Sequence, residues 1–452
     1  MTDDDDPARG FSHQPAYQRD DSELKLKPIE ITYEEVELSN GLRVVAHEDH
    51  ASPIVAVHIM YRAGSRDERV GRTGLAHLLE HLLFEGSENC PKGEFDRLLE
   101  RAGGTNNGST WLDRTNYYEV IPTHAVDLAL WLERERMGHF LPVLDEEMLE
   151  VQRSVVINER KQVYENRPYG LASERLQELL FPADHPYSWP TSGYTRDLEQ
   201  ITLQDARAFY STYYTPNNAV LVIAGDLGPD EAFARAERYF GDLPRGESPV
   251  APSPMARNGF TPGSVTMPDR VSFPRIHHAY AVPPYGSDEW VRLDVLSYLL
   301  ADGESSRFQR TLVRELEVAQ DVDTYLYPTQ LAGIFGIVAT TRSGIDEDRL
   351  QREIDAVLDR VAGDGVREGE VEGAIRRARR DHLNGLSNVE ERADEMAYAT
   401  TVLGSPGRLT ELLNEYSRVT AADVQRVAQQ YLRPEARATV VVVPAGEDHD
   451  DR

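Results

Sequence analysis

Two segments of the 452-residue chain repeat one pattern at a fixed spacing. "TLQDARAFYSTYYTPNNAVLVIAG" begins at Thr202, and "TAADVQRVAQQYLRPEARATVVVV" begins at Thr420. They share a threonine, an aspartate, a tyrosine and a proline, each 218 residues apart (420 minus 202). In both copies a helical pattern leads through a Tyr-x-x-Pro turn into a β-branched strand. A repeat of this length predicts a duplicated domain whose two halves have diverged.

The rest of the pattern fits two α+β halves joined by a linker. A chain of 452 residues is too long for one ordinary core. Strand-like stretches such as "IVAVHIMY" and "GIFGIVATT" alternate with amphipathic helical stretches in both halves. Prolines are dense in residues 244–270, which indicates an exposed linker. We therefore predict a disordered acidic tail at 1–28, domains at 29–243 and 271–446, a linker at 244–270 and an acidic tail at 447–452.

The segment "TGLAHLLEHLLFEG" places three ionisable side chains in a leucine-rich helix. At 100° per residue, His77, Glu80 and His81 lie on one helix face. We expect Thr73 to be the N-cap of this helix and Gly86 to end it. Burying three ionisable groups without partners is costly, so they need a counter-ion or a metal. Two imidazoles four residues apart suit zinc, and a glutamate beside them can accept a proton from the attacking water.

A metal site needs a third protein ligand, and a second helical segment offers one. "DEEMLEVQRSVVINERKQVYENRPYG", residues 145–170, predicts a long helix with Val151, Val155 and Val156 on its apolar side. Glu159 lies in its second half, directly after "VVIN". Three protein ligands leave a fourth position open, which is the arrangement of a catalytic rather than a structural zinc.

The order of these residues resembles a known family. His77-x-x-Glu80-His81, followed by Glu159 in "VVINER", is similar to the inverted motif of the pitrilysin and insulin-degrading-enzyme superfamily of zinc peptidases, the inverzincins. "AGGTNNGSTWLDRTNYYEVIP" (102–122) and "HPYSWPTSG" (185–193) match two further segments of that superfamily in the same order. The resemblance runs from about Leu38 to Pro444 and is strongest with bacterial members similar to the mitochondrial processing peptidase.

The resemblance implies a zinc endopeptidase that hydrolyses unfolded peptides or presequences. His77, His81 and Glu159 carry over as the ligands of one zinc per chain, and Glu80 carries over as the general base. It also implies two homologous domains, each a mainly antiparallel sheet covered by helices, which face each other across a substrate chamber.

Three further residues carry over from matched segments. Asn107 and Gly108 match the edge strand that pairs with the substrate main chain in this superfamily, although Gly108 stands where alanine is usual. Taken alone, Asn106 and Asn107 would fit a simple turn instead. Gln152 stands where many relatives carry a second glutamate that helps to orient the site; its amide can still hydrogen-bond to a metal ligand but supplies no negative charge, so it is a candidate supporting residue.

One pair of functional groups is missing from the second half. In superfamily members whose second domain helps to hold the substrate, an arginine and a tyrosine seven residues later contact the peptide. The matching positions here are Val313 and Gln320, in a segment (303–322) that predicts a helix running toward a strand. We therefore predict the zinc-bearing subunit of a heterodimer whose other subunit is homologous and metal-free. A self-sufficient homodimer and a non-catalytic core or assembly subunit are the alternatives.

Composition limits the partners and the compartment. The net charge of −29, from 48 basic and 77 acidic residues, argues against nucleic acid or an anionic membrane as partner. No stretch approaches 18 apolar residues, so we predict no membrane span. The first residues contain no apolar signal segment. Cys90 is the only cysteine, which fits a reducing interior, and we predict a cytoplasmic location.

Overall fold

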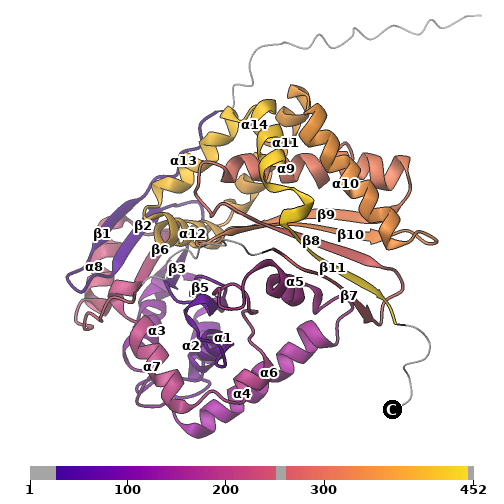
Figure 1. Ribbon diagram of the computed structural model, residues 1–452. Coiled ribbons are helices and arrows are strands. Elements are labelled where there is room, and N and C mark those ends of the chain that lie inside the picture. The colour runs from indigo at the N-terminus through magenta and orange to yellow at the C-terminus, as the bar shows by residue number, and fades with distance from the viewer. Residues whose placement is uncertain (1–26, 251–260, 446–452) are drawn as a thin grey trace, which may run out of the picture.

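The computed structural model describes residues 27–250 and 261–445. The tail predicted at 447–452, and all but the last two residues of the tail predicted at 1–28, lie outside these ranges. The described chain folds into two α+β halves, each with its own sheet (Figure 1). The predicted fold class is therefore confirmed.

The first sheet has six strands in the order β1-β2-β6-β3-β5-β4. Its strands are β1 (Glu34–Glu37), β2 (Arg43–Glu48), β3 (Ile54–Tyr61), β4 (Thr105–Thr110), β5 (Thr115–Pro122) and β6 (Ala219–Gly225). The β2–β6 pair is parallel and the other pairs are antiparallel. Strand β4 closes one end of the sheet, so its outer backbone edge pairs with no other strand of this sheet.

The second sheet repeats this topology without an equivalent of β1. Its order is β7-β11-β8-β10-β9, which matches β2-β6-β3-β5-β4 strand by strand. Its strands are β7 (Ser264–Asp269), β8 (Arg275–Val282), β9 (Ala319–Tyr327), β10 (Gly333–Thr341) and β11 (Arg437–Pro444). The parallel pair β7–β11 stands where β2–β6 stands in the first sheet. The edge strand β9 is therefore the counterpart of β4.

Helices pack on both sheets. Those preceding the second sheet are α1 (Leu75–Leu82), α2 (Glu94–Ala102), α3 (Val126–Gly138), α4 (Glu146–Arg160), α5 (Ala172–Leu180), α6 (Thr195–Leu198), α7 (Leu203–Tyr213) and α8 (Pro229–Phe240). Those of the second half are α9 (Trp290–Ala301), α10 (Glu347–Asp364), α11 (Glu368–Gly385), α12 (Val389–Tyr398), α13 (Gly407–Glu415) and α14 (Ala421–Tyr431). π-Helical turns follow α4 (Lys161–Glu165) and precede β9 (Gln309–Glu315).

The sequence repeat has the same local structure in both halves. Thr202 caps α7 by accepting a hydrogen bond from the backbone N–H of Asp205 at 3.2 Å, and the Asp205 carboxylate accepts the N–H of Thr202 in return. Thr420 and Asp423 form the same capping box on α14, also with a 3.2 Å bond. Each helix then leads through a short 3-10 turn into a buried central strand, β6 or β11. This local identity supports duplication.

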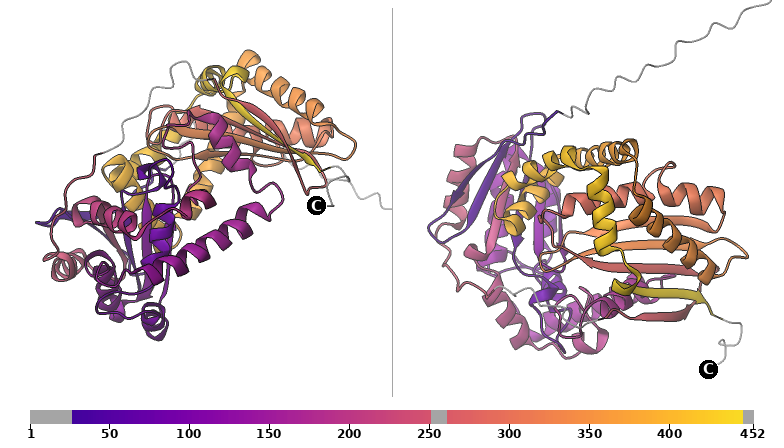
Figure 2. Two further views of the ribbon diagram at one scale, coloured as in Figure 1. Left: turned by 60° about the horizontal axis from the view of Figure 1, so that its bottom comes forward. Right: turned by 45° about the horizontal axis from the view of Figure 1, so that its top comes forward.

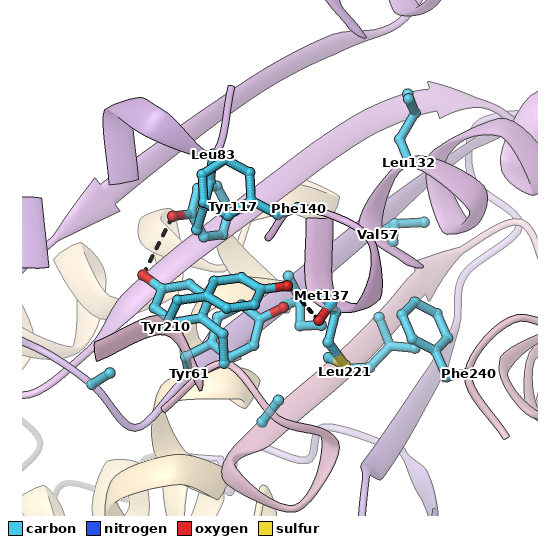
Figure 3. Close-up of a cluster of buried hydrophobic side chains, with 14 of the residues drawn as sticks. Val57, Tyr61, Leu83, Tyr117, Leu132, Met137, Phe140, Tyr210, Leu221 and Phe240 are labelled. Atoms are coloured by element: carbon cyan, nitrogen blue, oxygen red, sulfur yellow. Dashed lines mark hydrogen bonds between the residues drawn. The ribbon is translucent and has the colours of Figure 1, made fainter. Parts of the chain in front are cut away.

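The side chains of β3 alternate between the two faces of the sheet and contribute to a separate core on each face. Val57 and Tyr61 point to the helical layer formed by α1, α3, α4 and α7, whereas Ala56 and Met60 point to the opposite face. Figure 3 shows part of the first core, in which Tyr61, Tyr117 and Tyr210 lie beside aliphatic side chains. Such a sheet is buried on both faces, which explains the nearly unbroken apolar sequences of its central strands.

One face of each sheet is covered by a helix that belongs to the other half of the chain. α5, which precedes the linker, packs on β8 and β11 of the second sheet, where Leu176 and Leu180 join a core with Ile334 and Val440. α12, which follows the linker, packs on β3 and β6 of the first sheet. Figures 1 and 2 show both helices between the sheets. The predicted domain boundaries therefore do not coincide with the packing, because each sheet packs against a helix from the other side of the linker.

The hairpin turns of the two sheets also meet. Asp113, in the β4–β5 turn, accepts a 2.6 Å hydrogen bond from the hydroxyl of Tyr187 and a 2.8 Å bond from the backbone N–H of Gln330, in the β9–β10 turn. The hydroxyl of Tyr187 in turn accepts the N–H of Leu331 at 2.9 Å. Asp113 and Tyr187 are buried, so these bonds fix the end of β4 against the second half.

The predicted linker is too long at its C-terminal end. Residues 264–269, inside the predicted 244–270 linker, form β7 and pair with β11. Pro268 misled the prediction, because proline interrupts central strands. β7 is an edge strand, where a missing backbone donor costs little. Within the described ranges, no helix combines the length and apolar character needed to cross a bilayer.

Candidate active site

The helix α1 carries the first part of the site, and its beginning differs from the prediction. The N-cap is Gly74, with φ at +87°, rather than Thr73. The buried carboxylate of Glu68 accepts the backbone N–H groups of Gly74 at 2.9 Å and Ala76 at 2.8 Å, so it satisfies the donors that a threonine would have capped. Thr73 instead donates to Asp197 at 2.7 Å. α1 also ends at Leu82, before Gly86.

Two helices bring three potential metal ligands together. His77 and His81 lie one turn apart on α1, and Glu159 lies in the last turn of α4, which packs against α1. The Nε2 atoms of His77 and His81 are 3.9 Å and 3.2 Å from one carboxylate oxygen of Glu159. Ligand atoms of these three residues lie within 4.8 Å of one another, and no other such group occurs among the described residues.

This geometry fits a zinc ion. Tetrahedral zinc with ligand bonds of 2.0–2.1 Å separates its ligand atoms by roughly 3.3 Å, between the two distances seen here. Burial lowers the pKa of His77, which favours the neutral imidazole that binds metal. For His81, burial also acts downward, but the hydrogen bond with Glu159 prevails and raises the pKa. That hydrogen bond with His81 also lowers the pKa of Glu159.

Glu80 lies on the same side of α1 and is held by a residue of the edge strand. Its Oε2 accepts a 2.6 Å hydrogen bond from the hydroxyl of Thr110, the last residue of β4. Glu80 is buried, with 8% of its surface exposed, whereas the side chains of the neighbouring histidines are more accessible. Thr110 was missed in the sequence. Its only signal is strand alternation, which places it on the same side of β4 as Gly108.

The exposed edge of β4 contains both residues predicted to bind substrate. Asn107 pairs with Tyr118 of β5, and Gly108 pairs with Tyr117. The opposite backbone edge of β4 pairs with no other strand of this sheet. A Cβ atom at Gly108 would lie 3.1 Å from the rings of Phe84 and Tyr117. Phe84 lies two residues beyond the end of α1, so glycine lets β4 approach this helix closely. Substrate pairing at this edge stays a prediction.

α4 exposes two residues that were predicted to be buried. Val151 and Val155 are 44% and 43% exposed, whereas Val156 is fully buried. The buried face of α4 instead runs through Leu149, Gln152 and Val156, at the spacing of one helix stripe. α4 is covered along one side only, so the neighbouring valines face solvent.

Gln152 binds a different partner from the one expected. Its Nε2 donates a 2.7 Å hydrogen bond to Glu85, beyond the end of α1, and not to a candidate metal ligand. Glu85 also forms an ion pair with Lys92. Gln152 therefore ties α4 to the segment after α1, and the expectation that it orients a ligand is wrong.

The positions of the missing arginine and tyrosine lie in the second half. Val313 is in the π-helical turn before β9 and packs against the second core. Gln320 is exposed near the start of β9 and donates to the backbone carbonyl of Thr341 at 2.8 Å. The far end of β9 is the one that meets β4, because Tyr327 contacts Trp111. Tyr327 lies seven residues after Gln320 along the strand, a distance of about 23 Å.

Two family models match the chain. The model described as insulinase (peptidase family M16) covers residues 43–184, which include the histidines, Glu80 and Glu159. The model described as peptidase M16 inactive domain covers residues 200–378. The second match includes most of the half in which no metal-ligand group was found among the described residues.

Related proteins match over nearly the whole length. The zinc protease PqqE of Helicobacter pylori is 30% identical over 416 residues, which cover 91% of this chain and 93% of the relative. An uncharacterized zinc protease of Bacillus subtilis, YmxG, is 24% identical, covering 90% and 97%. The crystal structure of a protease from Helicobacter pylori superposes with a TM-score of 0.83 at 29% identity, covering 92% of this chain and 100% of that chain. A peptidase M16 inactive-domain structure from Pseudomonas fluorescens has the same fold, with a TM-score of 0.81 at 20% identity, covering 92% and 98%.

Proposed function

Because this chain belongs to the M16 (insulinase) peptidase family, we propose that it is a zinc-dependent endopeptidase that cleaves unfolded peptides. The observation that carries the proposal is the convergence of His77, His81 and Glu159, whose ligand atoms lie within 4.8 Å of one another. Glu80 lies on the same helix as the two histidines and accepts a hydrogen bond from Thr110 of β4. A non-catalytic assembly role would not require this complete set.

The side chains divide the work between binding and proton transfer. His77, His81 and Glu159 would hold the metal, with one position left for substrate. When bound there, zinc polarises the scissile carbonyl and acidifies water. Glu80 would accept the proton of the attacking water and deliver it to the departing amine. The hydrogen bond from Thr110 leaves the second oxygen of Glu80 available for this transfer.

The edge of β4 would hold the substrate. An extended peptide that adds to this strand gains backbone hydrogen bonds without reading its sequence. Only a chain segment without secondary structure of its own can pair in this way, so the proposed substrates are unfolded peptides or presequences. A cytoplasmic location is part of the proposal, since the chain has one cysteine and cannot form an internal disulfide.

Turnover of a quenched fluorescent peptide library tests this function. The zinc-loaded chain should cleave it, and Glu80→Gln should lower the rate at least about a thousandfold while zinc content is unchanged. Equal rates for the two proteins would disprove the assignment of Glu80. No cleavage under any condition, including added partner, would disprove the peptidase function.

A second subunit is the finer proposal, and the position of Gln320 favours it. Neither Val313 nor Gln320 has the guanidinium or phenol group of the missing arginine and tyrosine. Gln320 also lies about 23 Å along β9 from the end of the strand that contacts Trp111. Loss of one transition-state donor costs about 10²–10³ in rate. We propose that a homologous, metal-free subunit supplies these groups to the zinc site.

Rate measurements on mixtures test the second subunit. Adding a homologous, metal-free chain should raise the rate about a hundredfold or more at unchanged zinc content. The exposed pair Val151 and Val155 on α4 offers matched surface variants for mapping the contact. A full rate for the isolated chain at every concentration tested would favour a self-sufficient monomer, and a rate that rises with the square of its concentration would favour a homodimer.

A further inference from the structure

A cavity of about 240 Å³ lies in the second half, between α9, the first turns of α11 and the segment 303–310. Figure 1 shows α9 and α11 side by side, on the face of the second sheet away from α5. The residues that line this cavity include none of the candidate metal ligands and not Glu80. Its chemistry is therefore separate from that of the candidate active site.

Three arginines line this cavity in a chain whose net charge is −29: Arg310, Arg367 and Arg377. Within the described chain Arg310 has a single ion pair, 3.8 Å from Glu315, which is too long for a hydrogen bond. Arg367 is exposed at the rim, where its Nε lies 3.3 Å from Glu370. Each guanidinium carries five N–H donors, so most of the donors of these two side chains remain available to a ligand.

The third guanidinium lies over the beginning of α11. The Nε of Arg377 forms a 2.6 Å ion pair with Asp302, and one Nη donates to the carbonyl of Tyr298 at 3.2 Å. The other Nη is 3.4 Å from the place that a Cβ atom at Gly373 would take, and a Cβ atom at Gly369 would meet nothing within 4 Å. Both glycines line the cavity, so the positive end of the dipole of this 18-residue helix is open to it.

Ser306 adds a buried donor that no residue of the described chain uses. Its side chain lines the cavity and is 3% exposed, and its Oγ has no hydrogen-bond partner among the described residues. Buried hydroxyl groups in folded proteins are nearly always hydrogen-bonded. An unpartnered hydroxyl in a cavity lined with arginines therefore indicates a ligand that accepts hydrogen bonds.

The one carboxylate that lines the cavity is already neutralised. Glu370 accepts two hydrogen bonds from Arg307, at 2.7 and 2.8 Å, and a third from the backbone N–H of Arg367 at 3.0 Å. Its charge is therefore balanced by Arg307, which does not line the cavity. The arginines that do line it leave an excess of positive charge, which favours an anion.

We propose that this cavity is a binding site for a phosphate group, either as free phosphate or as the phosphomonoester of a small molecule. Guanidinium groups match phosphate oxygens with paired N–H donors, and the first turn of a helix supplies a favourable dipole. The hydroxyl of Ser306 would donate to a further oxygen. The inference goes beyond the proposed peptidase function and does not depend on it.

Equilibrium dialysis of the zinc-loaded chain against radiolabelled inorganic phosphate, at constant ionic strength in chloride, tests the site. One phosphate per chain should bind with a Kd of about 1 mM or lower. Arg310→Gln removes a guanidinium and Ser306→Ala removes the hydroxyl, and each should weaken binding about tenfold. Since the Oγ of Ser306 has no partner in the described fold, Ser306→Ala should not lower the thermal midpoint, which separates binding from folding.

Arg376→Gln is the matched control. Arg376 is exposed on α11, pairs with Glu372 and does not line the cavity, so this variant should bind phosphate like the unaltered protein. An absence of binding up to about 10 mM phosphate would overturn the inference. Binding that is unchanged in both Arg310→Gln and Ser306→Ala, as for phosphate held on the zinc, would overturn it too, and so would an equal loss in Arg376→Gln.

Competition distinguishes the two sources of the phosphate group. Glycerol phosphate should displace the labelled phosphate, and glycerol is the uncharged control. Displacement at lower concentrations than unlabelled phosphate requires would support the site and assign it to a phosphomonoester. Displacement only at higher concentrations would support the site and assign it to free phosphate. Displacement by glycerol itself would overturn the inference, because it would show that the charge is not recognised.

Discussion

The hydrogen bond between Thr110 and Glu80 is the most specific contact of the candidate site. Thr110→Val removes the hydroxyl that donates at 2.6 Å and keeps the shape of the side chain. A hydrogen bond to a charged group contributes about 1.5–3 kcal/mol, so we expect kcat to fall roughly tenfold or more at unchanged zinc content. Thr105→Val, on an exposed residue of the same strand, is the matched control. An unchanged kcat for Thr110→Val would show that Glu80 needs no positioning.

A partly buried ion pair in the second half predicts a pH effect on stability. Glu370 accepts two hydrogen bonds from Arg307, at 2.7 and 2.8 Å. Burial acts to raise the pKa of Glu370, but the bonds from Arg307 prevail and lower it to about 2 from the ordinary 4.5. A depressed carboxylate pKa stabilises the fold above the unfolded pKa, and this contribution is lost as the pH falls from about 4.5 to about 2.

Glu370→Gln should therefore lower the free energy of unfolding by about 1 kcal/mol at pH 7. The difference from the unaltered protein should shrink as the pH approaches 2. Urea unfolding at a series of pH values checks this expectation. A difference that stays constant down to pH 2.5 would mean that the charge of Glu370 is not responsible.

At the residue scale, local spacing identified the candidate ligands and could not identify their supports. His77, Glu80 and His81 share one helix face, so a single segment contained the information. Glu68 and Thr110 contact α1 from segments whose approach depends on the whole fold. The partner of Gln152 was misjudged for the same reason, since no local pattern indicates that Glu85 lies opposite α4.

The exchanged helices α5 and α12 are the main feature at the element scale. Met396 of α12 is fully buried against the first sheet, although it follows the linker in sequence. Met396→Ala should destabilise the protein by about 2–4 kcal/mol through the cavity that it leaves. Hydrogen exchange should then rise in β3 and β6, far away in sequence. Exchange that rises only between residues 261 and 445 would contradict the packing, and Glu391→Ala on the exposed side of α12 is the control.

The helices and strands were easier to predict from the sequence than the elements against which they pack. The helices and strands of the repeat follow from capping residues and β-branched runs, and both were found. The amphipathic stripes of α5 and α12 indicate helices with one apolar face but do not say which sheet that face covers. Pro268 similarly hid β7, because a proline tolerated at a sheet edge has the same sequence signature as one in a linker.

At the scale of the whole molecule, the two halves should depend on each other for stability. Fragments 27–250 and 261–445, expressed separately, would each leave one sheet face without its covering helix. We expect each fragment alone to lack a cooperative thermal transition and a mixture of the two to regain one. Circular dichroism melting curves provide the measurement. Cooperative melting of either fragment alone would show that the exchanged helices are dispensable.

Duplication could be predicted from the repeat, but the closeness of the halves could not. The family resemblance implied a chamber between two facing domains. Within this chain the space between the sheets is largely filled by α5 and α12, and a cavity of about 330 Å³ lies beside the candidate site. A larger chamber would require a second chain, which is consistent with the proposed heterodimer.

Zinc titration of the metal-free chain tests the central claim, that α1 and α4 together hold one catalytic zinc. Competition with a chromophoric chelator gives the stoichiometry and the affinity without depending on substrate or partner. We predict one tightly bound zinc per chain for the unaltered protein and for Glu80→Gln. Glu159→Gln, which removes the only candidate ligand on α4, should bind at least about a hundredfold more weakly. Absence of tight binding in the unaltered protein, or equal affinity in Glu159→Gln, would contradict the account.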